Sequence, residues 1–171
     1  MLSILIPSNI TLFWGNDFLK VTGPMGSVIK RKGPMSLGLK ENRLYILGVD
    51  SNEKKHFYLS LLRALLFGVS KGYRRKLRLS GVGYKGVVLD NKLNLKLGYS
   101  HPITYDIPED VQVQCSKNKG LLINIKGKEL HRVCQVAAEI RALKFPDVYK
   151  GKGIHYDKEQ LILKKGKRES K

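Results

Sequence analysis

The feature that most constrains the fold is an alternation of apolar and polar residues with a period of two. In residues 92–99, KLNLKLGY, leucine occupies alternate positions at Leu93, Leu95 and Leu97, so an extended chain has one apolar face and one polar face. The same period occurs in residues 76–82, 111–115 and 121–126. These segments predict β-strands in sheets that bury one face and hydrate the other, and the hydrated positions are often lysine or arginine.

Two other segments follow the period of a helix. Residues 54–70 are apolar on nearly every side, which predicts a largely buried helix with a narrow polar stripe of His56, Ser60 and Arg63. Residues 129–144 separate apolar from polar positions, which predicts an amphipathic helix with Ala137 and Ala138 on its sheet-facing side. This helix should end before Pro146, because the residue that precedes a proline disfavours the helical conformation.

The order of these segments predicts an internal duplication. In each half, strands lead to a tight connection, a helix and one further strand, and the similar words VTG and IKG occur at 21–23 and 125–127. The last strand is predicted around residues 159–164. The predicted fold class is therefore α+β, with two similar subdomains, each an antiparallel β-sheet packed against one α-helix. The predicted subdomains are residues 1–80 and residues 81–171, the second with a basic tail.

The net charge limits the partners of the chain. Its 171 residues include 32 Lys and Arg against 14 Asp and Glu, a formal charge of +18. Nucleic acid is the commonest polyanion that neutralises such a surface. The charge is concentrated in residues 71–100 and 146–171, which favours a directed basic surface. A membrane surface is the weaker alternative, because the longest apolar run, residues 57–69, is shorter than the roughly 20 residues of a spanning helix.

Targeting and metal-binding signals are weak in this sequence. The first ten residues lack the basic region of a secretory signal, and their apolar stretch ends at Pro7. Cys115 and Cys134 have neither a partner at C-x-x-C spacing nor a histidine at zinc-ligand spacing. We therefore expect no disulfide framework, no metal site and a reducing compartment.

The glycines of GVGYKG, residues 81–86, match the letter pattern of a dinucleotide-binding loop. That loop needs a helix after the glycines, whereas residues 87–97 alternate as strands around a turn at Asp90 and Asn91. The glycines are therefore interpreted as a bend, with an NAD-dependent enzyme as the remaining enzymatic alternative. Because none of the four histidines neighbours a nucleophile and a carboxylate, we expect no catalytic residue, no cofactor and no small-molecule substrate.

Residues 146–156, PDVYKGKGIHY, are the strongest candidate for a binding segment. Lys150 and Lys152 alternate with glycines, so their backbone is bare enough to approach a phosphate chain. Tyr149 and Tyr156 flank the two lysines and are suited to stacking on bases. This combination is typical of contacts with structured RNA, where shape and phosphates dominate recognition. A solvated turn with two core tyrosines is the alternative.

Several words of the sequence, in a fixed order, resemble the large-subunit ribosomal protein L6 family. These words are GVGYKG, LGYSHPITYDIP, VCQVAAEIRALKFPDVYKGKGIHYDKE and LKKGK, and the resemblance is strongest over residues 76–168. IPSNI, VTGPMG and GVSKGY resemble the N-terminal half of the family, whereas residues 27–53 match it poorly.

The resemblance implies two like α/β subdomains that assemble into the large ribosomal subunit beside neighbouring ribosomal proteins. The C-terminal half would bind ribosomal RNA near the sarcin–ricin loop, where translation factors act. By position, the residues implied to bind rRNA are Tyr99, Ser100, His101, Tyr149, Lys150, Gly151, Lys152, Gly153, His155, Tyr156, Lys164, Lys165, Lys167 and Arg168. A free RNA-binding accessory protein or RNA chaperone is the alternative function, because the charge alone supports it equally.

The chain departs from the family pattern at several positions. Glu129 and Leu130 stand where the family has Asp and Lys, and Val148 and Cys134 replace a proline and a glycine. His155 replaces an arginine, which removes a permanent charge that grips phosphate with two donors. With Lys outnumbering Arg 23 to 9, this drift favours a ribosome of the mitochondrial matrix, encoded in the organelle. The bacterial cytoplasm and the plastid are the alternatives.

Overall fold

The chain is divided into two compact units. The computed structural model describes residues 3–48, 51–116 and 121–166. What we call the first unit comprises residues 1–73 and 127–130, and the second unit comprises residues 74–126 and 131–171. The subdomain boundary predicted from the sequence, between residues 80 and 81, stays a prediction.

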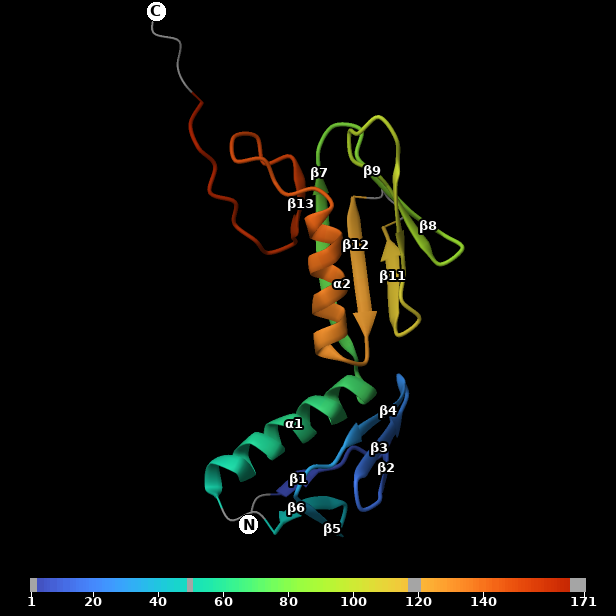
Figure 1. The fold of residues 1–171 in the computed structure, drawn as a ribbon, viewed down its shortest axis with the longest axis vertical. Helices are drawn as coiled ribbons and strands as arrows, with labels where there is room; N and C mark the ends of the chain where they lie inside the picture. The colour runs from blue at the N-terminus through green and yellow to red at the C-terminus, as the bar shows by residue number, and fades with distance from the viewer. Residues whose placement is uncertain (1–2, 49–50, 117–120, 167–171) are drawn as a thin grey trace, which may run out of the picture. The chain divides into compact units, whose positions relative to one another are not determined.

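Among its described residues, the first unit contains two three-stranded sheets and helix α1 (Asn52–Ser70) (Figure 1). Its strands are β1 (Ser3–Leu5), β2 (Thr11–Trp14), β3 (Phe18–Gly23), β4 (Gly26–Arg31), β5 (Ser36–Lys40) and β6 (Arg43–Leu47). The sheets have the orders β1-β6-β5 and β2-β3-β4, and every pair is antiparallel. The helix packs against strands of both sheets over a core that includes Leu19, Leu44 and Leu62.

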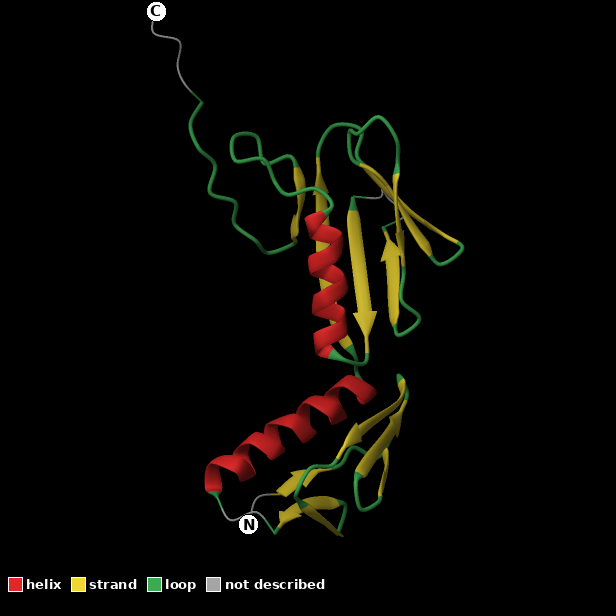
Figure 2. Ribbon diagram, viewed as in Figure 1, coloured by secondary structure: helices red, strands yellow, loops and turns green. Residues whose placement is uncertain are grey.

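Helix α1 has the predicted position but not the predicted burial. Its inner face carries core residues at spacings of three and four, namely Leu59, Leu62, Leu66 and Val69. On its other side, Phe57 is 63% exposed and Phe67 is 46% exposed. The prediction of a largely buried helix is wrong, because the two small sheets cover only one side of this helix (Figure 2).

Among its described residues, the second unit contains a four-stranded sheet, a three-stranded sheet and helix α2 (Leu130–Ala142). Its strands are β7 (Tyr73–Ser80), β8 (Lys85–Leu89), β9 (Lys92–Lys96), β10 (Ile103–Asp106), β11 (Val111–Cys115), β12 (Leu122–Gly127) and β13 (Gly153–Tyr156). The sheets have the orders β11-β12-β7-β13 and β10-β9-β8. Helix α2 lies along one face of the four-stranded sheet (Figure 1), and the core includes Leu77, Ile125, Val133 and Ile140.

The predicted α+β fold class is confirmed, and each alternating segment contains an observed strand. The amphipathic helix is confirmed as α2, where Ala137 is buried as predicted. Ala138 is exposed, so its predicted placement on the sheet-facing side is wrong. One position along a helix turns a side chain by about 100°, which takes Ala138 off the buried stripe.

The predicted final strand around residues 159–164 is wrong, because these residues form no strand and the last strand of the described residues is β13. It pairs antiparallel with β7, from Gly153 opposite Ser80 to Tyr156 opposite Leu77. After Tyr156 the chain turns, since the carboxylate of Glu159 accepts the backbone N–H of Tyr156 at 3.0 Å. This local bond competes with an extended conformation of the following residues.

The bend predicted at GVGYKG is confirmed. Strand β8 follows the glycines, where a dinucleotide loop would need a helix. Gly83 has φ +77°, a conformation that favours glycine. At Gly81 a Cβ would lie 2.8 Å from the ring of Tyr84, so that glycine permits a close approach.

Candidate nucleic-acid interface

The lysine-glycine loop, residues 146–153, is held closed by Asp147. The side-chain carboxylate of Asp147 accepts a hydrogen bond from the backbone N–H of Lys150 at 2.9 Å. The backbone carbonyl oxygen of Asp147 accepts one from the N–H of Gly151, also at 2.9 Å. The N–H of Asp147 donates to the carbonyl oxygen of Lys152 at 2.9 Å. Lys150 and Lys152 are exposed, and no carboxylate among the described residues forms an ion pair with either. Both charges are therefore available to an external anion.

The two glycines of this loop are buried and serve its packing. Gly151 has φ +65°, and a Cβ there would lie 3.4 Å from a methyl carbon of Leu161. A Cβ on Gly153 would lie 2.6 Å from the carbonyl oxygen of Phe145 and from Cα of Pro146. The glycines let the chain fold tightly here, and their predicted contact with RNA stays a prediction.

The loop after β9 lies toward the same end of the second unit as the lysine-glycine loop (Figure 1), and it contacts the residues just before that loop. The hydroxyl of Tyr99 donates to the carbonyl oxygen of Leu143 at 3.2 Å, and the ammonium of Lys144 lies 4.1 Å from the Tyr99 ring centroid. Such a cation–π contact orients both groups. Ser100 and His101 are exposed in the same loop. Lys144 in turn holds the start of β13, because its carbonyl oxygen accepts the N–H of Ile154 at 2.9 Å.

The three predicted tyrosines have different surroundings. Tyr149 is 55% exposed beside Lys150, so its ring is available for stacking. The exposed Tyr99 ring is already in contact with Lys144. Tyr156 lies after these loops at the end of β13 and carries the guanidinium of Arg141 over its ring, 5.5 Å from the centroid.

His155 connects two strands of the sheet instead of facing solvent. Its side chain is 9% exposed, and its Nε2 lies 2.8 Å from the hydroxyl oxygen of Ser80 on β7. Its Nδ1 lies 3.0 Å from the carbonyl oxygen of Tyr156, which can only accept, so Nδ1 donates there. Both ring nitrogens of this buried side chain already have partners within the protein, and the predicted rRNA contact of His155 stays a prediction.

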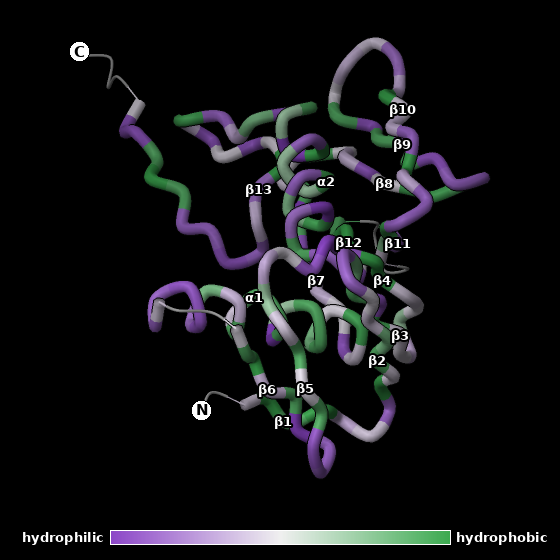
Figure 3. The backbone as a smooth tube through the Cα atoms, turned by 60° about the horizontal axis from the view of Figure 1, so that its bottom comes forward, coloured by the Kyte–Doolittle hydropathy of each residue, from purple (hydrophilic) through white to green (hydrophobic). Residues whose placement is uncertain are grey.

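The segment after β13 folds back onto the lysine-glycine loop. The N–H of Lys164 donates to the carbonyl oxygen of Val148 at 2.8 Å. Figure 3 shows that this segment changes from hydrophilic to hydrophobic and then to hydrophilic again. Lys164 and Lys165 are exposed, whereas the predicted site residues Lys167 and Arg168 lie outside the described residues.

Glu159 anchors the start of that segment. Its carboxylate accepts the N–H of Tyr156 and pairs with Arg141 at 2.6 Å. The bond from the Tyr156 backbone, followed by the Arg141 guanidinium, lowers the pKa of Glu159. Because Arg141 also lies over the Tyr156 ring, one ion pair fixes both the ring and the turn that follows it.

Sequence reasoning missed two cations of this region, Arg141 and Lys144. Both lie in or just after the last turn of α2, where a basic residue is ordinary because it complements the helix dipole. Their aromatic partners, Tyr156 and Tyr99, become visible only once the strands are paired. The signal that could have found Lys144 is its place next to Phe145 and Pro146, directly before the candidate segment.

The arrangement is suited to contacting a polyanion. It combines exposed lysines with partly exposed tyrosines on a backbone fixed by hydrogen bonds, the chemistry that contacts phosphates and stacks on bases. Within the described residues, no group of three or more His, Cys, Asp or Glu could hold a metal ion. No helix in the described part of the chain is long and apolar enough to cross a membrane.

Comparisons with known proteins agree with this geometry. The family described as Ribosomal protein L6 matches residues 80–157. The chain is 43% identical to the large ribosomal subunit protein uL6 of Mycoplasma capricolum, over 89% of this chain and 86% of that protein. It is 37% identical to uL6 of Mycoplasmoides gallisepticum, over 96% and 92% of the two chains. It is 38% identical to uL6m of Reclinomonas americana, over 96% and 95%. Identities at this level over nearly the whole of each chain show that the protein belongs to the ribosomal protein L6 family.

Proposed function

We propose that this protein is a structural constituent of the large ribosomal subunit that binds ribosomal RNA near the sarcin–ricin loop. Its second half, predicted as residues 81–171, is the RNA-binding part, and neighbouring large-subunit proteins are its other partners. Membership of the L6 family supports assembly into the subunit. The observation that carries RNA binding is the pair of exposed lysines, Lys150 and Lys152, presented without carboxylate partners on a loop closed by Asp147.

The test is the salt dependence of binding to a large-subunit rRNA fragment that contains the sarcin–ricin loop. Each lysine that neutralises a phosphate releases condensed counterions, so replacing both with alanine should weaken binding. The log–log salt slope should become shallower by about 1.4 to 1.8. Lys20→Ala with Lys40→Ala is the matched control, because these lysines are exposed in the first unit and remove the same charge. Equal slopes for the two double variants would contradict the assignment to the loop.

The alternative, a free RNA-binding accessory protein, predicts a different distribution in cells. A subunit constituent sediments with large subunits in a sucrose gradient at high salt, whereas an accessory protein or RNA chaperone dissociates into the light fractions. Mass spectrometry of the two fractions distinguishes them. Co-sedimentation lost at moderate salt would overturn the proposed role as a constituent.

The proposed function is non-enzymatic, with no small-molecule substrate, no cofactor and no membrane partner. The proposed location is a mitochondrial ribosome, supported by the excess of Lys over Arg, 23 to 9. Bacterial and plastid ribosomes are the alternatives. Similarity to uL6m of Reclinomonas americana fits a mitochondrial location, and similarity to bacterial uL6 proteins fits a bacterial one. Mass spectrometry of ribosomes isolated from purified mitochondria tests the location.

A further inference from the structure

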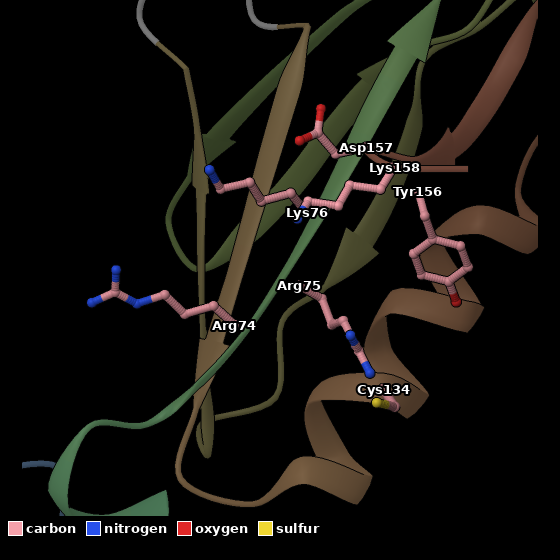
Figure 4. Close-up of a pocket in the computed structure, with 7 residues that line it drawn as sticks. All are labelled: Arg74, Arg75, Lys76, Cys134, Tyr156, Asp157 and Lys158. Carbon is pink, nitrogen blue, oxygen red and sulfur yellow. The ribbon is translucent and has the colours of Figure 1, made fainter. Parts of the chain in front are cut away.

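A second basic site lies in the second unit, outside the lysine-glycine loop. It is a pocket of about 680 Å³ at the start of β7. Four cationic side chains line it: Arg74, Arg75, Lys76 and Lys158 (Figure 4). Except for Tyr156, none of its lining residues was among the predicted site residues.

The pocket exists because β13 is shorter than β7. The register of the two strands ends with Tyr156 opposite Leu77, so the edge of β7 before Leu77 has no strand partner on that side. The N–H of Asp157 donates to the carbonyl oxygen of Lys76 at 3.0 Å, which is the last backbone link beyond the strand pair. Backbone groups of alternate residues point the same way, so those of Arg74 face the open edge.

The cations reach this edge from both faces of the sheet. Successive side chains of a strand point to opposite faces, so Arg74 and Lys76 share one face and Arg75 lies on the other. Figure 4 shows Arg75 directed toward Cys134 of α2, while Arg74 points away from that helix. A bound chain that passes over the edge would therefore meet positive charge on both sides.

The positive charge of the pocket is not neutralised from within. The one carboxylate in the lining, Asp157, pairs with Arg78 at 2.8 Å. Among the described residues, none of the four lining cations forms an ion pair with a carboxylate. Like charges that line one pocket repel one another, and an anionic ligand relieves that repulsion.

Tyr156 adds an aromatic surface that is already fixed in place. Arg141 lies over its ring, and the Arg141–Glu159 ion pair at 2.6 Å holds that guanidinium. The Tyr156 backbone N–H is bound by the same Glu159 carboxylate at 3.0 Å. A ring ordered in advance loses little entropy when a base stacks on it.

We propose that this pocket binds an unpaired nucleotide of an RNA strand, with its phosphates on Arg74, Lys76 and Lys158 and its base against Tyr156. The inference rests on the proposed RNA-binding function and names a second contact, separate from the lysine-glycine loop. An unpaired nucleotide is chosen over a duplex because bases are exposed for stacking only where the strand is splayed. The pocket is also concave and is formed at a single strand edge.

The first experiment compares two RNA hairpins that have the same loop and equal charge. The stem of one is fully paired, and the stem of the other contains a single-nucleotide bulge. The full-length protein should bind the bulged hairpin more tightly. Arg74→Gln with Lys76→Gln should abolish this preference and reduce the salt slope for the bulged hairpin by about 1.4 to 1.8. Lys150→Ala with Lys152→Ala, the matched pair from the loop, should weaken binding to both hairpins and keep the preference.

The second experiment separates stacking from charge. Tyr156→Leu should reduce affinity for the bulged hairpin by about 5- to 150-fold without changing the salt slope, because a stacked base contributes binding that does not depend on counterions. Tyr156→Phe keeps the ring and should bind as the parent does. Circular dichroism of each variant shows whether it is folded before its affinity is compared.

Cys134 provides a direct probe of occupancy. In a Cys115→Ala background, alkylation of Cys134 by iodoacetamide should be slowed by the bulged hairpin and little affected by the paired one. Equal affinity for both hairpins, with an unprotected Cys134 and unchanged binding by the Arg74→Gln, Lys76→Gln variant, would overturn the pocket and leave the proposed function intact. Failure of the parent to bind either hairpin or the rRNA fragment would overturn the proposed function itself.

Discussion

The first and second units contain the same hairpin, closed in the same way. In the first unit, Glu41 and Asn42 form a two-residue turn between β5 and β6 with φ 49° and 61°. In the second unit, Asp90 and Asn91 form the turn between β8 and β9 with φ 48° and 59°. Asn tolerates this left-handed conformation better than most residues, which explains why it occupies the second turn position in both hairpins.

Each turn asparagine also clamps a neighbouring strand. The side-chain amide of Asn42 donates to the carbonyl oxygen of Ile6 at 2.9 Å. The side-chain amide of Asn91 donates to the carbonyl oxygen of Ile107 at 3.0 Å. In return, the N–H of each isoleucine donates to the backbone carbonyl oxygen of its asparagine, at 3.0 Å in both units. Each isoleucine is followed by a proline, and the two Ile-Pro words lead into β2 and β11.

The two units share these contacts but not the order of their strands along the chain. Strand β1 precedes its hairpin, whereas β10 follows its hairpin, yet both occupy the same place in the orders β1-β6-β5 and β10-β9-β8. The words VTG and IKG end β3 and β12, the central strand of one sheet and an inner strand of the other. The second unit differs by adding β13 and the loop before it, and the candidate RNA contacts lie on or beside these additions.

The largest expected effect comes from matched cavities in the two hairpins. Leu44 of β6 and Leu93 of β9 hold equivalent positions after the turn, and both are fully buried. Replacing either with alanine should destabilise its own unit by about 2 to 5 kcal/mol. Trp14, the single tryptophan, reports on the first unit by fluorescence during urea unfolding. Leu44→Ala should lower the urea concentration at the midpoint of the fluorescence transition. An equal shift caused by Leu93→Ala would show that the two cores do not unfold separately.

Ala137 and Ala138 provide a smaller test, restricted to the second unit. Ala137→Leu should overpack the buried side of α2 and cost about 1 to 3 kcal/mol, whereas Ala138→Leu on the exposed side should cost almost nothing. Thermal unfolding followed by circular dichroism measures both. Equal melting temperatures for the two variants would contradict the orientation of this helix.

The two asparagine clamps should make equal contributions if the hairpins are true counterparts. Asn42→Ala and Asn91→Ala each remove one hydrogen bond and place alanine at positive φ, at a cost of about 1 to 2 kcal/mol. Asn→Gly at the same positions removes the bond but relieves the backbone, so it should recover part of the loss. Chemical unfolding of the four variants gives their free energies of unfolding. A loss of stability for the variants of only one unit would show that the two hairpins are not counterparts.

The smallest effect concerns Glu159, which has no counterpart in the first unit. Its pKa is lowered in the folded protein, so its contribution to stability is present above the ordinary carboxyl pKa of 4.5 and is lost as the pH falls through the lowered value. Glu159→Gln should therefore lose less stability than the parent between pH 7 and pH 3, by a few tenths to about 1 kcal/mol. Glu109→Gln, at an exposed position, is the control. Identical losses for the parent and Glu159→Gln would contradict the anchoring role.

The pattern of apolar residues in the sequence predicted those strands and helices whose burial on one side is reflected in their own residues. Leucines at alternate positions of β9 and the periodic apolar face of α2 reflect burial against a neighbouring layer, so these elements could be read from the sequence. Strand β13 was missed because it is only four residues long and begins at a glycine. The exposure of α1 was missed because hydrophobic pattern does not reveal how much sheet is available to cover a helix.

Only the part of the candidate site whose residues are neighbours in the sequence was predicted. The segment with Lys150 and Lys152 was visible because its residues are neighbours in the chain. The pocket combines Arg74 and Lys76 with Lys158, which lie far apart in the sequence and meet only through the register of β7 and β13. The burial of His155 depends on the same register, since its hydrogen-bond partner Ser80 comes from β7.

The open edge of β7 also affects the protein before it meets RNA. An uncovered strand edge is a template on which a second copy can add its own strand, and this is how many β-proteins begin to aggregate. Here the edge carries Arg74 and Lys76, so two copies that approached edge to edge would bring like charges together. The same cations that we assign to phosphate contacts should therefore also oppose edge-to-edge pairing of two copies.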